Sequence, residues 1–579
     1  MSPLFTNPII PGFSPDPSIC VVPPPTSSSI PLSQAHISPT TSTSYFLTTS
    51  TFTLFPSCAI YHSTDLLNWE LIGHALTRRS QIEMRTPEAG AGSWASTLRY
   101  RIEENGNGGG KTGRWYLCTG VFSRYRPQMD ERIFPRGFYV TTTNIWDSSS
   151  WSDPIYFDNP GFDQDLFWDD DGRVYLSTTT RTSTRSSGNP AKKDFAIHIS
   201  EIALPTGRTL TAPTVIRASP SGVAEGSHIV KRGRYYYLFT AEGGTEQGHQ
   251  EWVFRSAEGV LGPWVSRPAG GPLWYNGVEG KVQRTGHVDV FEAGEGGSWW
   301  AVLLGVRPVR DADADAGWLE PQLGRETFLV GVEWVDDWPV FNRGETVGLL
   351  TLGPEAAVQR PKERVWKADL AIDDLELGWY EKNTPLKKCW SLTERPGWLC
   401  IHGGCYDLRS PEAPTMLLRR QTSFEQSFSV RLDFAPTRIG YEAGLVLWWD
   451  MHSFASIGVT LTSDGRRVLK VTIPTDTADA FKEQYFSIQK GPLRLRILAA
   501  PKSYTLHLAG SEEAEATTVA SAVILSKSLT KVPPVGQPFL GAMFGVYAFG
   551  NGEPCLDAAY FRDIVCADLD LDRRFGVGE

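Results

Sequence analysis

Three acidic residues, Asp16, Asp163 and Glu225, occupy matching places in a pattern that repeats along the 579-residue chain. Two carboxyl groups on either side of a glycosidic bond can hydrolyse it, because one protonates the leaving oxygen while the other activates a water molecule. A third carboxylate raises the pKa of the acid by like-charge repulsion and keeps it protonated near neutral pH. A single acid beside a turn is usually solvated, whereas three in register favour a base, an acid and a modulator.

The first of these acids lies in the stretch "SPDPS", where Pro15 and Pro17 flank Asp16. Each proline fixes a backbone angle and removes an N–H donor, and Pro17 also restricts Asp16 itself. We therefore expect the carboxylate of Asp16 to be held in one place.

The elements that must position these acids follow from five similar segments, each rich in aromatic and β-branched residues that are typical of buried strands. They are aligned at positions 46, 116, 175, 237 and 302, so the spacings are 70, 59, 62 and 65 residues. Five β units at a near-constant period predict a five-bladed β-propeller. A large sandwich is the competing fold, but it would not predict so even a period.

Twelve residues before the aligned position lie Asp163 in the third unit and Glu225 in the fourth. In the fifth unit a longer hairpin at 292–298 moves the equivalent place to His287. After allowance for two insertions, the same place in the first two units belongs to Asp16 and Trp94. The first strand of each propeller blade lines the central channel, so the repeat predicts that these five side chains converge there.

The sequence resembles glycoside hydrolase family 43, in its β-xylosidase and α-L-arabinofuranosidase branch. The resemblance covers most of the chain and rests on long motifs in order, among them "NPIIPGFSPDPSIC" (7–20), "GSWASTLRY" (92–100), "GFDQDLFWDDDGRVYL" (161–176), "AEGSHIVKRGRYYYL" (224–238), "GHVDVFEA" (286–293) and "LGRET" (323–327).

The resemblance implies a role for each acid. Asp16 would be the general base, Glu225 the general acid, and Asp163 the residue that tunes the pKa of the acid and orients the substrate. The mechanism would be single-displacement inversion, in which roughly 6.5–9.5 Å between the two carboxyl groups admits a water molecule.

The resemblance also implies the walls of a sugar pocket. Arg325 would bind sugar hydroxyl groups, and Trp94 and Phe52 would form apolar walls. His287 would lie at the centre of the channel, where some members of the family hold a calcium ion. No cofactor is required by this mechanism, and calcium is left open.

Four residues depart from the family pattern. Gln164 replaces a proline, Asp165 adds a charge beside Asp163, Ser57 replaces a glycine and Ser96 replaces a proline. None of them removes a catalytic carboxylate. They bear instead on the shape of the pocket and so on substrate preference.

The repeat stops near residue 350, and we expect residues 1–352 to form the propeller, 353–365 a linker and 366–579 a second domain. Alternating strands joined by turns predict a concanavalin-like antiparallel β-sandwich there, similar to the C-terminal domain of the same enzymes. In relatives an aromatic loop of this domain closes the pocket, and Phe539 is the candidate for that role here. The alternative is that Phe539 only packs the sandwich. A closed pocket would favour exo cleavage.

The composition excludes several partners. The formal net charge is −10 and no basic cluster occurs, which argues against nucleic acid and anionic membranes. No segment approaches the roughly 20 apolar residues that span a bilayer. The N-terminus "MSPLFTNPII" lacks the features of a secretory signal, and no Asn-x-Ser/Thr sequon occurs, so we expect a cytoplasmic protein, or a secreted one if a signal was trimmed. A homo-oligomer is left open.

Together these features predict a β-1,4-xylosidase that releases terminal xylose from xylo-oligosaccharides. An α-L-arabinofuranosidase that acts on arabinose-substituted oligosaccharides, or an enzyme with both activities, is the alternative. A carbohydrate-binding protein without catalysis and a structural propeller for protein partners are the non-enzyme alternatives.

Overall fold

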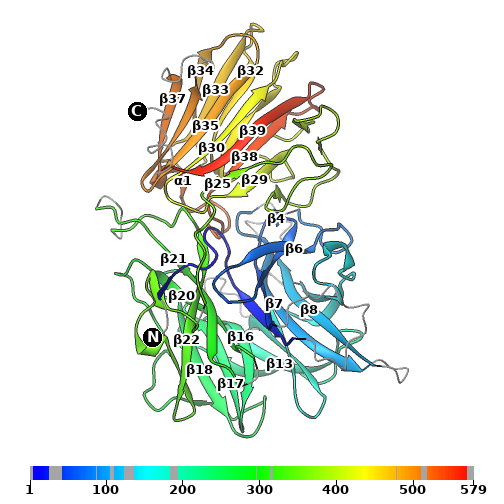
Figure 1. Cartoon of the computed structure of the whole chain (residues 1–579), viewed down its shortest axis with the longest axis vertical. Coiled ribbons are helices and arrows are strands. Elements are labelled where there is room, and N and C mark those ends of the chain that lie inside the picture. Colours follow the sequence, from blue (N-terminus) through cyan, green and yellow to red (C-terminus); the bar gives the residue numbers. More distant parts are fainter. Residues whose placement is uncertain are drawn as a thin grey trace.

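Two β-rich parts make up the chain, the first in blue to green and the second in yellow to red (Figure 1). Among the described residues the single α-helix is α1 (Ser526–Leu529), so the predicted all-β fold is confirmed. None of those residues forms a helix with the length and apolar composition that crossing a bilayer requires. The computed structural model describes residues 4–24, 42–85, 88–104, 110–122, 136–182, 194–294, 296–312, 314, 317–355, 357–477, 479–509 and 518–569.

The first part contains five antiparallel sheets, each built from strands that follow one another in the chain. The first two sheets are made of β2 (Ser18–Val22), β3 (Ser44–Thr49), β5 (Ser57–Ser63) and β6 (Glu70–Leu76), and of β7 (Gly92–Glu104), β8 (Lys111–Phe122), β9 (Arg136–Thr142) and β10 (Ile155–Pro160). The third is made of β11 (Phe162–Trp168), β12 (Val174–Arg181) and β13 (Phe195–Ala203), with β14 (Arg208–Thr209) and β15 (Thr214–Ala218) both paired to β13. The last two are made of β16 (Ala224–Arg232), β17 (Tyr235–Glu242), β18 (Gln250–Ser256) and β19 (Val265–Ser266), and of β20 (Gln283–Glu292), β21 (Trp299–Val306), β22 (Arg325–Val335) and β23 (Trp338–Phe341).

The first strands of the five sheets contact one another in a closed order. β2 contacts β7, β7 contacts β11, β11 contacts β16, β16 contacts β20, and β20 contacts β2 again. The five repeated segments of the sequence all fall on the second strands, β3, β8, β12, β17 and β21. The first strands are therefore the part of the fold where residues from all five sheets can meet.

The second part is a sandwich of two antiparallel sheets. One sheet holds β25 (Val365–Lys367), β27 (Trp390–Ser391), β28 (Leu399–Ile401), β30 (Gln426–Asp433), β35 (Leu493–Ala500), β36 (Ser503–Ala509), β37 (Thr518–Leu525) and β39 (Ala559–Asp568). The other holds β29 (Met416–Arg420), β31 (Glu442–Asp450), β32 (Ser453–Leu461), β33 (Arg467–Pro474), β34 (Phe481–Ser487) and β38 (Met543–Phe549). Their inner faces share one buried core, in which Phe428 and Phe544 stack across the sandwich with ring centroids 5.6 Å apart.

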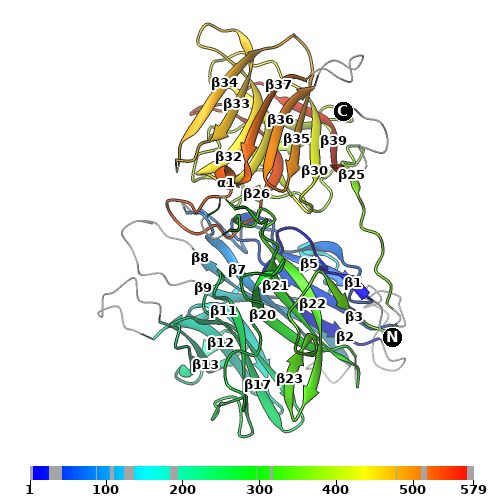
Figure 2. The same ribbon diagram turned by 90° about the vertical axis from the view of Figure 1, so that its left-hand side faces the viewer.

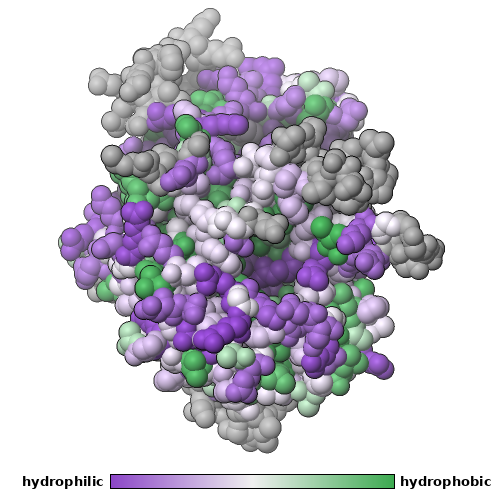
Figure 3. Space-filling model, turned by 60° about the horizontal axis from the view of Figure 1, so that its bottom comes forward, coloured by the Kyte–Doolittle hydropathy of each residue, from purple (hydrophilic) through white to green (hydrophobic). Residues whose placement is uncertain are grey.

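The two parts are joined by strand pairing and by an apolar cluster. Strand β4 (Leu54–Phe55) of the first part pairs with β26 (Glu381–Lys382) of the second. Within the first part, β1 (Leu4–Thr6) pairs with β24 (Leu350–Leu352), which brings its two ends together. The connecting segment between β24 and β25 runs along the right-hand side of Figure 2. Phe13 and Phe52 of the first part share a buried cluster with Trp448 and Met543 of the sandwich. Figure 3 brings the five-sheet end forward and shows a hydrophilic hollow near its centre.

Candidate active site

A β-bulge interrupts the first strand of four sheets at the same level. The pairing with the second strand shifts between Ser93 and Ser96, Phe162 and Asp165, Glu225 and His228, and Gly286 and Asp289. A bulge bends its strand and re-aims a side chain, and bulges are frequent next to active sites. Three of these bulges contain the predicted site residues Trp94, Asp163 and His287, and the remaining one begins at Glu225.

The backbone at these places lies in the left-handed region. The φ angles are 52° at Asp16, 54° at Asp163, 54° at His287 and 58° at Gly226. For residues other than glycine this conformation is uncommon, and it persists only where the surroundings fix it, often at functional sites. The fold therefore holds Asp16, Asp163 and His287 in a conformation that their own preferences do not favour.

The loop that carries Asp16 is tied to strand β22. The backbone N–H of Ser14 donates to the carbonyl of Arg325 at 2.9 Å, and the Thr327 hydroxyl donates to the carbonyl of Ser14 at 2.6 Å. Nη1 of Arg325 donates to Oδ1 of Asp16 at 3.0 Å. The Asp16 side chain is 5% exposed, so the guanidinium balances the charge of a buried carboxylate.

The other predicted residues meet at the Glu225–Gly226 peptide. The N–H of Gly226 donates to Oδ2 of Asp163 at 2.9 Å. A Cβ atom on Gly226 would lie 2.9 Å from Nδ1 of His287, so only glycine allows this approach of backbone to ring. Nδ1 of His287 lies 3.9 Å from Oδ1 of Asp16. The structure thus brings Asp16, His287, the backbone of Glu225 and Asp163 together.

The crowding of acids changes their proton binding. Burial, and then the negative charges of Glu225 and Asp16, raise the pKa of Asp163 well above its ordinary value. Burial lowers the pKa of His287 to about 4, which makes its imidazole neutral at neutral pH. The cluster can therefore hold a carboxylic proton at a pH at which an ordinary aspartate has lost it.

Aromatic rings from both parts of the chain surround Arg325. The guanidinium carbon lies 4.9 Å from the ring centroid of Phe52 and 5.1 Å from that of Phe539. Phe539 precedes β38, and its ring centroid lies 5.3 Å from that of Phe52 and 6.1 Å from that of Trp94. Trp94 stacks on Phe122 at 4.4 Å. The structure thus places Phe539 beside the predicted sugar-pocket residues, where its ring contacts the five-sheet part.

Two N–H-bearing nitrogens of Arg325 make no hydrogen bond within the described part of the chain. Its Nη1 also donates to the Thr245 hydroxyl at 3.2 Å, but Nε and Nη2 are buried and have no hydrogen-bond partner among the described residues. Buried donors are nearly always paired in folded proteins. These N–H groups lie beside Asp16 and between two aromatic rings. They are suited to donate hydrogen bonds to the oxygen atoms of a ligand.

The sequence did not predict a second group of charged residues, which lies on the same first strands as the site. Arg99 of β7 donates to Asp165 through Nε at 3.0 Å and Nη2 at 2.7 Å, and to Asp289 through Nη1 at 2.7 Å. Nδ1 of His228 lies 2.9 Å from Oδ2 of Asp165. Arg99 therefore pairs with the charge that Asp165 was expected to add beside Asp163. One available signal was the basic residue within the otherwise uncharged strand motif "GSWASTLRY".

The donor atoms around His287 fit a calcium ion poorly. Calcium takes six to eight oxygen ligands, whereas His287 offers one imidazole and its neighbour Asp16 is paired with Arg325. Within the described residues, three or more His, Cys, Asp or Glu donors lie within 4.8 Å of one another only at Glu394, Cys400 and His402 of the sandwich. That group belongs to another part of the molecule.

Comparison with known proteins identifies the class. Residues 33–339 match the model of glycosyl hydrolases family 43, and residues 368–564 match the β-xylosidase C-terminal concanavalin A-like domain. The protein is thus a glycoside hydrolase with a concanavalin-like C-terminal domain, as predicted. More particularly, the chain belongs to glycosyl hydrolase family 43.

Relatives of similar length support this assignment. The chain is 30% identical over 573 residues to the non-reducing end α-L-arabinofuranosidase BoGH43B of Bacteroides ovatus, covering 97% of this chain and 95% of that protein. It is 31% identical to the xylan 1,3-β-xylosidase of a Vibrio species over 81% of this chain and 82% of that one. The solved xylan β-1,4-xylosidase of Bacillus halodurans superimposes with a TM-score of 0.79 at 26% identity, over 97% of this chain and all of that one. These matches favour an enzyme over a binding protein without catalysis.

Proposed function

We propose that the protein is an inverting exo-glycosidase that releases terminal xylose from xylo-oligosaccharides as a β-1,4-xylosidase. The observation that carries the proposal is the convergence of Asp16, Asp163 and the Glu225–Gly226 peptide beside the unpaired N–H groups of Arg325. Carboxyl groups supply the proton and the base, and the arginine supplies donors to sugar hydroxyl groups. No cofactor takes part in the proposed reaction, and a calcium ion beside His287 would need water for most of its ligands.

In the proposed mechanism Glu225 donates its proton to the leaving glycosidic oxygen, and the bond from that oxygen to the anomeric carbon breaks. Asp16 takes a proton from a water molecule, whose oxygen attacks the anomeric carbon from the opposite face. Asp163 accepts a hydrogen bond from the Gly226 N–H, next to the acid. Because like charges repel, Asp163 and Glu225 together hold a proton more tightly than either carboxylate would alone. Each turnover inverts the anomeric configuration, and the two carboxyl groups regain their starting states by proton exchange with water.

We further propose that the five sheets are the blades of a five-bladed propeller. The closed order of contacts among β2, β7, β11, β16 and β20 supports a ring of first strands around one axis. In that arrangement the bulges re-aim side chains toward the axis. Phe539, from the sandwich, would then close one side of the pocket and favour removal of one terminal sugar at a time.

The choice between xylose and arabinose rests on relatives that differ. The Bacteroides relative is named for arabinofuranose and the Vibrio relative for xylose, while a Butyrivibrio fibrisolvens relative is named a xylosidase/arabinosidase. Both terminal sugars offer similar hydroxyl groups to Arg325. Parallel assays of 4-nitrophenyl β-D-xylopyranoside and α-L-arabinofuranoside test the proposal. A higher kcat/KM for the xyloside is expected, and far faster cleavage of the arabinofuranoside would make the alternative correct.

Replacement of Asp163 by asparagine is expected to change both pH dependence and stability. Asparagine carries no charge, so the basic limb of the kcat/KM profile should move to lower pH by about one unit. In the wild type, the folded-state pKa of Asp163 is raised above the ordinary 3.8. Its contribution to stability is therefore full below that ordinary pKa and is lost as the pH rises through the raised one. Asparagine does not ionise, so the variant does not lose stability in this way as the pH rises. It should therefore be more stable than the wild type at neutral pH.

Urea unfolding at several pH values and a pH–rate profile measure both effects. The matched control is Asp373→Asn, which removes an exposed acid of the sandwich. A basic limb that stays in place in Asp163→Asn would contradict the role of Asp163 as modulator.

Replacement of Arg325 by lysine is expected to weaken substrate binding. Lysine keeps a positive charge near Asp16 but loses the planar fork whose Nε and Nη2 are unpaired. We expect kcat/KM to fall about 100-fold, chiefly through a higher KM. Steady-state kinetics with the exposed Arg343→Lys as control measure this. An unchanged KM would mean that Arg325 serves only to pair with Asp16.

A further inference from the structure

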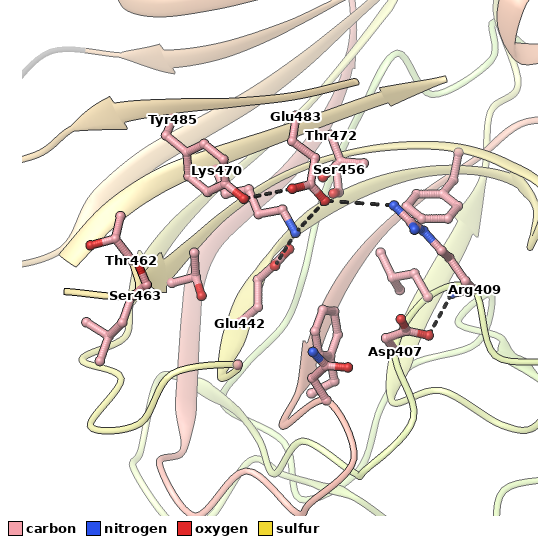
Figure 4. A pocket seen from close by; sticks show the side chains of 17 residues that line it. Asp407, Arg409, Glu442, Ser456, Thr462, Ser463, Lys470, Thr472, Glu483 and Tyr485 are labelled. Atoms are coloured by element: carbon pink, nitrogen blue, oxygen red, sulfur yellow. Dashed lines mark hydrogen bonds and ion pairs between the residues drawn. The ribbon is translucent and has the colours of Figure 1, made fainter. Parts of the chain in front are cut away.

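A cavity lies on the sandwich, on the outer face of the sheet that contains β31 to β34. Its volume is about 570 Å³. Figure 4 shows Lys470, Glu483, Tyr485, Glu442 and Arg409 pointing into it from neighbouring strands and from the loop before β29. None of these residues belongs to the candidate active site. We call this cavity the sandwich groove.

A glycine in this sheet makes room for a tyrosine that contacts the charged residues of the groove. Register places Tyr547, Gly444, Gly458, Lys470 and Tyr485 side by side across β38, β31, β32, β33 and β34. Residues that pair in this way project from the same face of a sheet. The two residues at the centre of the row have no side chains, and the Tyr547 hydroxyl lies 2.4 Å from the place that a Cβ on Gly458 would take.

The charges in the groove compensate one another. Nζ of Lys470 lies 3.0 Å from Oε1 of Glu483 and 3.3 Å from Oε2 of Glu442. The Tyr547 hydroxyl donates to Glu442 at 2.6 Å, and Nη2 of Arg409 lies 3.8 Å from Glu483. The third carboxylate of the groove, Asp407, accepts a hydrogen bond from the backbone N–H of Arg409 at 3.1 Å. A phosphate or another anion would meet three carboxylates, and a cation would meet lysine and arginine. Because these charged groups already have partners within the groove, it is suited to a neutral polar ligand.

The remaining lining matches the surface of a sugar. Tyr485 is 52% exposed, and its hydroxyl donates to Glu483 at 2.7 Å, which fixes the ring at the edge of the groove. An exposed aromatic ring offers an apolar face for the C–H groups of a pyranose. Hydroxyl groups and planar carboxylates offer donors and acceptors to sugar hydroxyls. The lining hydroxyl groups come from Ser456, Thr460, Thr462, Ser463 and Thr472.

We propose that the sandwich groove is a second, non-catalytic carbohydrate-binding site that holds a neutral glycan chain. The choice of xylan as that chain rests on the proposed function. Glu442 and Glu483 are paired with Lys470, and Asp407 accepts the backbone N–H of Arg409, so none of the three acids of the groove is placed to act as a free acid or base. The same sheet face continues into the cluster that contains Phe52 and Phe539, since Phe454 and Phe549 belong to both the groove and that cluster. A glycan bound in the groove would lie on the same face of the sandwich that packs against the five-sheet part.

Affinity electrophoresis of the full chain in native gels with soluble arabinoxylan tests the proposal. The wild type should be retarded, and Tyr485→Ala should weaken the apparent affinity about tenfold. Glu483→Gln, which keeps the shape of the side chain, should also weaken it. The matched control is Tyr156→Ala, which removes a tyrosine that is 51% exposed on β10. All variants should hydrolyse 4-nitrophenyl glycosides at the wild-type rate.

The outcomes separate the two proposals. Equal retardation of the wild type and Tyr485→Ala, or no retardation in either arabinoxylan or hydroxyethyl cellulose, would overturn the groove proposal. Retardation in hydroxyethyl cellulose but not in arabinoxylan would overturn xylan as its ligand. Failure to hydrolyse either nitrophenyl glycoside would overturn the proposed function, and the gel would still report on the groove.

Discussion

Glu225→Ala is expected to lose about 1,000-fold in kcat on xylobiose. The leaving group of xylobiose is a sugar alkoxide, which departs readily only if a proton reaches its oxygen in the transition state. A 2,4-dinitrophenyl xyloside has a leaving group that is stable as an anion, so the same variant should lose far less on that substrate. The dependence of the loss on the leaving group is the signature of a missing acid.

Comparison of the two substrates across pH measures this effect. The basic limb of the pH–rate profile should disappear in the variant, because that limb reports the acid. Glu246→Ala is the matched control, since Glu246 is an exposed residue in the loop that carries Thr245. An equal loss on both substrates would assign Glu225 to another role.

Asp16→Asn is expected to lose about 1,000-fold in kcat on every substrate, whatever the leaving group. An amide cannot take a proton from water, and the base acts on the nucleophile rather than on the departing oxygen. Asparagine keeps an oxygen that can accept from Arg325, so the loop tied to β22 should stay in place. The melting temperature and the affinity for xylose should therefore change little.

Kinetics on xylobiose and on the dinitrophenyl xyloside, with Asp373→Asn as control, measure this prediction. A loss confined to the poorer leaving group would exchange the roles of Asp16 and Glu225. Activity close to that of the wild type would remove Asp16 from the mechanism altogether.

Much of the site could be predicted because the chain repeats. The repeated segments mark the second strand of every sheet, so a fixed step back along the chain reaches the first strand. Asp163 and Glu225 appear at that step without correction. His287 needed a shift of three residues, and the shifted residue lies within the bulge between Gly286 and Asp289.

The rest depends on contacts that a linear pattern does not contain. The left-handed backbone at Asp163 lies within a bulge; aspartate adopts this conformation more often than most residues, but its type alone does not place the bulge there. Arg99 finds Asp165 and Asp289 only because three first strands meet. Phe539 could be proposed from resemblance, but its place beside Arg325 comes from the docking of the sandwich. In the sandwich, the Tyr547 hydroxyl lies close to Gly458 of a neighbouring strand, a contact that only the register of the sheet reveals.

In the proposed single displacement, Asp16 and Glu225 act on opposite faces of the sugar. Proton NMR during the first minutes of hydrolysis of 4-nitrophenyl β-D-xylopyranoside tests it most directly. We expect α-xylose to appear first, with β-xylose following only as mutarotation proceeds. Appearance of β-xylose as the first product would mean retention of configuration and would contradict the assignment of Asp16 as a base.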